Sequence, residues 1–154
     1  MKQGSTIFLR FVVILLGLGA LSVLVFVLPS AISSDKTGLF RPLLIGMYGP
    51  AIPFFIALFQ TLKLLKYIDS NTAFSNFSVG ALKIIKYCGI AISAMYAAGM
   101  PYIFRVADQD DAPGAVAMGL VIIGASFTVA VFAAVLQRLL KNAIDIKSEN
   151  DLTV

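Results

Sequence analysis

Residues 11–28 read FVVILLGLGALSVLVFVL, a run of 18 residues that contains no charged side chain. An α-helix of roughly 20 mostly apolar residues is long enough to cross the hydrocarbon core of a bilayer. The run lacks the alternation of apolar and polar residues that is typical of a membrane β-strand. It therefore predicts a transmembrane helix over about residues 7–28.

Three further segments have the same character. They lie at about residues 43–62, 84–104 and 115–136, and each is bounded by charged residues, proline or clustered serine and asparagine. Backbone N–H and C=O groups in lipid must find partners within the protein, so we expect all four segments to be helices. The prediction is an all-α fold in which residues 1–154 form a single integral membrane four-helix bundle. The stretch 63–83 is then a cytoplasmic loop, and 137–154 is a cytoplasmic tail.

The overall composition agrees with a bilayer as the main solvent. Of the 154 residues, 59% are hydrophobic and 13% are charged, and the mean hydropathy is +0.93. Soluble domains are about 45–50% apolar and about 25% charged. A water-soluble fold of this length would bury only about two-thirds of its surface and would expose large apolar patches. The composition therefore excludes a water-soluble globular domain.

The distribution of lysine and arginine predicts the orientation in the membrane. Cytoplasmic loops are enriched in these residues, and here an N-terminus in the cytoplasm places nine on the inner side and three on the outer side. The inner set is Lys2, Arg10, Lys63, Lys66, Lys83, Lys86, Arg138, Lys141 and Lys147, and the outer set is Lys36, Arg41 and Arg105. We predict a multi-pass protein of the cell (plasma or inner) membrane with both termini in the cytoplasm.

The net charge of +4 has the same explanation, since basic flanks attract anionic lipid of the inner leaflet. The lipid bilayer is thus an expected partner, and nucleic acid is not. Histidine is absent and there is one cysteine, so no Cys/His zinc site and no His-based catalytic triad can be built. We predict a protein that is not an enzyme, with no catalytic residues, no cofactor and no metal.

The loop between the second and third spans carries the candidate partner-binding residues. Ser75 is expected to be the N-cap of a helix that continues into the third span. An apolar stripe with lysines reaching the interface would then lie beside the lipid headgroups. The stripe is Phe74, Phe77, Ala81 and Ile84, and the lysines are Lys83 and Lys86. Either the loop anchors its own bundle, or Phe74, Phe77, Lys83 and Lys86 bind a cytoplasmic protein.

Two prolines lie inside the second span. Pro50 and Pro53 each remove a backbone hydrogen bond, which predicts a helix break. The break is either a purely structural kink or the broken helix of a transporter. The middles of the four spans contain no Asp, Glu, Lys or Arg, which disfavours a proton-coupled carrier.

Other polar and small residues inside the spans predict how the helices associate. We expect the polar ones to donate interhelical hydrogen bonds; they are Ser22, Gln60, Ser93, Tyr96, Ser126 and Thr128. Small residues recur every fourth position and allow close approach of backbones. They are Gly89, Ser93 and Ala97 in the third span, and Ala115, Gly119, Ala130 and Ala134 in the fourth. They predict packing within one bundle or, alternatively, a homodimer face.

Several segments together resemble a known family. They are Ala51-Ile52-Pro53-Phe54-Phe55, Tyr67-Ile68-Asp69, Ala73-Phe74-Ser75, residues 81–87 (ALKIIKY) and the tail 136–154 (LQRLLKNAIDIKSENDLTV). Over nearly the whole chain, the sequence resembles domain-of-unknown-function family 2975, the YoaS-like bacterial membrane proteins. The resemblance implies a small four-helix membrane protein without an assigned activity, from a family often paired with small helix-turn-helix regulators. It implies no catalytic residues.

Two functions remain open from the sequence. The first is an interaction or regulatory module that presents the 63–86 region and the tail to a cytoplasmic partner, such as a helix-turn-helix regulator. The alternative is a small transporter, channel or toxin-immunity protein that acts through the helix bundle, where the Pro50 and Pro53 break would matter most.

Overall fold

The computed structural model describes residues 2–34, 38, 41–111 and 113–152, which are almost entirely helical. The elements in chain order are α1 (Lys2–Ser22), the π-helical segment η1 (Val23–Val27), α2 (Leu28–Ser34), α3 (Arg41–Gly46), α4 (Tyr48–Asp69), α5 (Asn76–Asp110) and α6 (Pro113–Leu152). No strand occurs among these residues.

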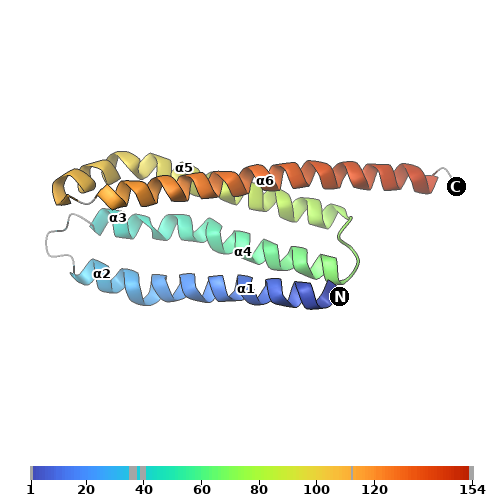
Figure 1. Cartoon of the computed structure of the whole chain (residues 1–154), viewed down its shortest axis with the longest axis horizontal. Helices are drawn as coiled ribbons and strands as arrows, with labels where there is room; N and C mark the ends of the chain where they lie inside the picture. Colours follow the sequence, from blue (N-terminus) through green and yellow to red (C-terminus); the bar gives the residue numbers. More distant parts are fainter. Residues whose placement is uncertain (1, 35–37, 39–40, 112, 153–154) are drawn as a thin grey trace.

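The elements form four rods that lie side by side (Figure 1). The first rod is α1, η1 and α2, the second is α3 and α4, and α5 and α6 are the third and fourth. The N-terminus and the α4–α5 turn lie at the same end of the bundle, which we refer to as the turn end. Four helices are long and apolar enough to cross a membrane, so the predicted all-α membrane bundle is confirmed.

The first rod is continuous but changes its hydrogen bonding in the middle. The N–H of Leu28 donates to the carbonyl of Val23, five residues back, instead of to that of Leu24. The next residue, Pro29, has no N–H to offer. The Leu24 carbonyl is therefore left without its usual helical donor, and the Tyr48 hydroxyl donates to it over 2.9 Å. This bond ties the start of α4 to the first rod.

The second rod is broken at Met47, which lies between the last residue of α3, Gly46, and the first residue of α4, Tyr48. Pro50 explains the position, because it has no N–H for the carbonyl of Gly46. The Met47 N–H is shared between the carbonyls of Leu43 and Leu44, each at 3.2 Å. Pro53, in contrast, lies within α4 without ending it. The discontinuity thus lies about one turn before Pro50, the first of the two prolines that the sequence singles out.

Helices α5 and α6 pack along most of their length, and α5 carries more buried side chains than any other described helix. Gly89 makes this contact possible. A Cβ at this position would lie 2.8 Å from the Ser126 carbonyl oxygen and 3.0 Å from the Cβ of Ala130. Gly89 and Ala130 therefore serve packing within one bundle, whereas Ala97 is exposed. A homodimer face stays a prediction.

Hydroxyl groups contribute less to this packing than the sequence predicts. Ser126 donates to the carbonyl of Ile122 over 2.7 Å, and Thr128 donates to that of Gly124 over 2.7 Å, both within α6. The expectation that these two residues bond across helices was wrong, because a carbonyl one turn back is within reach at little conformational cost. Ser93 does reach the other helix, at 3.5 Å from the Ile123 carbonyl.

Helix α6 is longer than a membrane span. Its 40 residues extend over about 60 Å, twice the thickness of the hydrocarbon core. The part predicted as a tail from residue 137 continues as helix to Leu152 and projects beyond the other rods at the turn end (Figure 1). The projecting part exposes Ile146 and Leu152.

We predict that Gly89→Ala lowers the stability of the bundle by about 1–3 kcal/mol, because the added methyl group overpacks the α5–α6 contact. Gly124→Ala is the matched control on the partner helix, since a Cβ there meets nothing within 4 Å. The free energy of unfolding in mixed micelles, measured by titration with a denaturing detergent, checks the effect. Equal stability of the two variants would contradict the packing described.

Candidate functional site

The α4–α5 turn is folded by its own hydrogen bonds. The Thr72 N–H donates to the Tyr67 carbonyl over 2.8 Å, and the Ser70 and Thr72 hydroxyls lie 2.8 Å apart. Asn71 adopts the left-handed conformation, with φ of 60°, that Asn tolerates better than most residues. The turn is therefore a defined structure that holds the adjoining side chains in place.

Ser75 takes the N-cap position of α5 but does not cap it with its side chain. Its backbone is extended, as N-cap residues require, with φ −142° and ψ 161°. Its hydroxyl, however, donates backwards to the Thr72 carbonyl over 2.6 Å. The predicted helix start is thus correct, whereas its side chain stabilises the turn rather than an N–H of the helix.

The two predicted phenylalanines are exposed beside this turn. Phe74 is 60% exposed and Phe77 is 73% exposed. The Phe77 ring packs against that of Tyr67 on α4, with 6.0 Å between ring centroids. Phe74, Phe77 and Tyr67 form an aromatic surface at the turn end, and we refer to these three residues as the turn surface.

The two predicted lysines lie elsewhere. Lys86 follows Phe77 by nine residues, which is a rotation of about half a turn around the helix, so the two side chains leave α5 on opposite flanks. Lys86 lies over the Tyr87 ring, 4.8 Å from its centroid, and faces a groove with Arg138 and Lys141 of α6. Lys83 is exposed. The structure therefore does not bring the four candidate residues into one patch.

An ion pair that the sequence analysis missed joins the first two rods at the turn end. Arg10 of α1 lies 2.8 Å from Asp69, the last residue of α4, and the Thr6 hydroxyl donates to the same carboxylate over 2.5 Å. A carboxylate at a helix C-terminus is unfavourable beside the negative end of the helix dipole. Arg10 and Thr6 compensate for this position, so Arg10 pairs within the protein.

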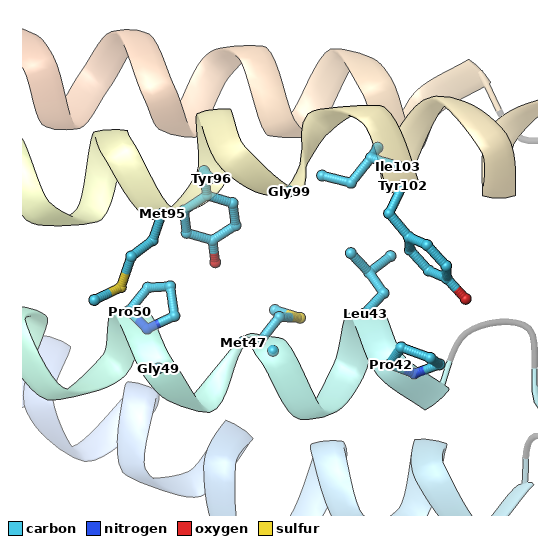
Figure 2. A pocket seen from close by; sticks show the side chains of 11 residues that line it. Pro42, Leu43, Met47, Gly49, Pro50, Met95, Tyr96, Gly99, Tyr102 and Ile103 are labelled. Atoms are coloured by element: carbon cyan, nitrogen blue, oxygen red, sulfur yellow. The ribbon is translucent and has the colours of Figure 1, made fainter.

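Near the helix break, a cavity of about 240 Å³ separates α3 and α4 from α5 (Figure 2). The Tyr96 side chain extends from α5 toward α4 with its hydroxyl in the space between them (Figure 2). Apart from Tyr96 and Tyr102, the residues that line the cavity are apolar. The cavity is lined by Pro42, Leu43, Gly46, Met47, Gly49, Pro50, Met95, Tyr96, Gly99, Tyr102 and Ile103.

Two neighbouring cavities, of about 260 and 160 Å³, share Met47 and Tyr96 with the first. One extends toward the first rod and the other toward α6, so the three surround the break in the second rod. No Asp, Glu, Lys or Arg lines them in the described part of the chain. Their chemistry suits an apolar molecule with at most one or two hydrogen-bonding groups, and it does not suit an ion.

The sequence has relatives among known bacterial membrane proteins. The sequence profile of a family described as "Protein of unknown function (DUF2975)" matches residues 29–154. The "Uncharacterized membrane protein YoaS" of Bacillus subtilis (strain 168) is 53% identical over 161 aligned positions, which cover 100% of both chains. No solved structure shows a significant match to the chain.

We predict an energetic coupling of about 1 kcal/mol between Arg10 and Asp69, because each side chain is only partly exposed, at 38% and 21%. The variants Arg10→Gln, Asp69→Asn and the double variant form a double-mutant cycle, read by the free energy of unfolding. Each single change leaves an unpaired charge, so the double variant should lose less than the sum. Strict additivity would show that the pair does not stabilise the bundle.

Proposed function

Because the chain belongs to the DUF2975 family, whose function is unknown, we propose a role from the structure: a non-enzymatic multi-pass membrane protein that acts as an interaction or regulatory module. Its partner is a cytoplasmic protein, and the binding site is the turn surface. The observation that carries the proposal is the exposure of Phe74 and Phe77 beside a hydrogen-bonded turn and outside the four predicted spans.

The proposal includes an orientation in the cell membrane with both termini in the cytoplasm. The positive-inside distribution of lysine and arginine supports it. The N-terminus, the α4–α5 turn and the projecting part of α6 gather at one end of the bundle (Figure 1). In this orientation that whole end faces the cytoplasm, where a soluble partner can reach it.

The chemistry of the turn surface favours a protein with an apolar pocket. Exposed aromatic side chains are the residues that most often anchor protein–protein interfaces, because they bury a large area with few rotatable bonds. The Phe77–Tyr67 contact fixes one ring before binding, which lowers the entropy lost on association. A small helix-turn-helix regulator is the partner that the family resemblance brings forward.

We predict that the double variant Phe74→Ala/Phe77→Ala lowers the affinity for the partner more than tenfold. Both rings are exposed in the free protein, and each contributes at least about 1 kcal/mol when the partner buries it at an interface hot spot. A photo-crosslinking amino acid at position 77 in living cells, followed by mass spectrometry, identifies what the surface touches. Phe132→Ala is the matched control, because Phe132 is 64% exposed on α6 but lies within a predicted span. Crosslinks to lipid alone would rule out the protein partner.

The alternative function acts through the bundle, as a small transporter, channel or toxin-immunity protein. The broken second rod and the cavities around Met47 and Tyr96 are the observations that favour it. Transporter sites are often built at such broken helices. The absence of charge around the described cavities restricts this alternative to an apolar or weakly polar substrate.

For this alternative, we predict that Pro50→Ala abolishes flux of the substrate into liposomes, because the new N–H can bond the Gly46 carbonyl and join α3 to α4. Pro53→Ala is the control, since Pro53 lies within α4 without interrupting it. Circular dichroism confirms that both variants fold. Flux that is unchanged in Pro50→Ala, or absent from the unaltered protein, would remove the alternative.

A further inference from the structure

A basic groove lies between α5 and α6 near the turn end of the bundle. It has a volume of about 450 Å³ and combines three cationic side chains with one amide. The lining residues are Lys86, Ala134, Val135, Gln137, Arg138 and Lys141. No acidic residue lines the groove in the described part of the chain.

The helix geometry explains how the cations meet. Arg138 and Lys141 are three residues apart on α6, so they project from one face. Ala134 lies one turn before Arg138 and leaves room for the facing Lys86 of α5. The Tyr87 ring lies beneath the Lys86 ammonium group, 4.8 Å away, and limits where this long side chain can point. The groove is thus preformed by two packed helices.

The charges in the groove are not neutralised by neighbouring carboxylates. Asp145 follows Lys141 by one turn of α6, yet no ion pair joins the two among the residues that the structure describes. The Arg10–Asp69 pair belongs to the other side of the bundle, between α1 and α4. Three like charges held together repel one another, and a bound anion relieves this repulsion.

The predicted spans place the groove at the depth of a membrane surface. Lys86 is two residues inside the third predicted span, and Arg138 is two residues beyond the end of the fourth. The surrounding surface is apolar, with Tyr87, Val135 and Leu139 exposed. A ligand here meets cations with one part and an apolar helix surface with the other, which matches the headgroup and acyl chains of a phospholipid.

We propose that this groove binds the phosphate of an anionic phospholipid headgroup. Lys86, Arg138 and Lys141 bind the phosphate oxygens, and Gln137 donates a further hydrogen bond to the headgroup. Basic pockets between transmembrane helices hold anionic lipid headgroups in the same manner. A free phosphate compound shares the headgroup chemistry but makes no use of the apolar surface beside the groove, so the lipid is the favoured occupant.

The test uses the full-length protein in mild detergent and native mass spectrometry with two lipids of identical acyl chains. Phosphatidylglycerol carries a net negative charge, whereas phosphatidylcholine does not. We expect tighter binding of phosphatidylglycerol, and a roughly fivefold loss of its affinity in each of Lys86→Gln, Arg138→Gln and Lys141→Gln. The affinity should also fall as the salt concentration rises.

Lys63→Gln is the matched control. Lys63 is an exposed lysine over the Phe59 ring, 5.0 Å from its centroid, so the change removes the same charge and the same kind of contact outside the groove. Its affinity for phosphatidylglycerol should stay within about twofold of the unaltered protein. Arg138→Lys keeps the charge and should therefore bind phosphatidylglycerol more tightly than Arg138→Gln does, although not as tightly as the unaltered protein.

Three outcomes would overturn the proposal. The first is equal binding of the two lipids, and the second is a loss of phosphatidylglycerol affinity in Lys63→Gln equal to that in the groove variants. The third is displacement of the lipid by stoichiometric glycerol phosphate, which would identify a soluble phosphate compound as the ligand. The proposal is independent of the turn surface. Phe74→Ala/Phe77→Ala should keep its affinity for phosphatidylglycerol even if it binds no protein partner.

Discussion

In the hydrocarbon core of a membrane, no water is available to bind a backbone carbonyl that has lost its helical partner. This constraint decides where the rods of the present bundle are connected. The shift to π-helical hydrogen bonding before Pro29 leaves the Leu24 carbonyl without its usual donor, and the Tyr48 hydroxyl satisfies it from the second rod. An irregularity in one helix thereby becomes a contact between two.

The same constraint explains why the hydroxyl groups of Ser126 and Thr128 bond within α6 while close packing holds α5 and α6 together. A serine or threonine in lipid gains its hydrogen bond most directly from a carbonyl in the preceding turn of its own helix, as Thr61 does with Ala57 over 2.8 Å. Such a bond adds nothing to the association of helices. Apart from the long Ser93–Ile123 bond, the association of α5 with α6 must then come from surface shape, and the contact of Gly89 with Ser126 and Ala130 provides it.

Hydropathy was sufficient to predict the four rods, because the length and apolarity of a span are local properties of the sequence. The break in the second rod was also predictable, since proline removes a donor wherever it stands, although the sequence did not show that α3 would end at Gly46, one turn before Pro50. The Arg10–Asp69 pair was not predictable, because it depends on how two helices from distant parts of the chain are placed side by side.

For the candidate site, only part of the arrangement could have been predicted from the sequence. The separation of Phe77 from Lys86 could have been found in the sequence, because nine residues correspond to half a turn of rotation on any α-helix. The predicted set of four residues followed their position along the chain and did not take this rotation into account. The facing of Lys86 toward Arg138 and Lys141, in contrast, requires the register of α5 against α6, which depends on side-chain packing around Gly89 and Ala130.

The distribution of irregularities also indicates which part of the bundle can move. Helix α6 runs without interruption from the cavity lined by Gly119 to the basic groove, and its contact at Gly89 of α5 leaves little room for sliding. Sliding of α5 along α6 is therefore unfavourable. The second rod is divided at Met47 and lies beside the three apolar cavities. Among the described residues, a broken helix and adjacent cavities occur together at this point, so a movement of α3 relative to α4 is the rearrangement that the structure most readily allows.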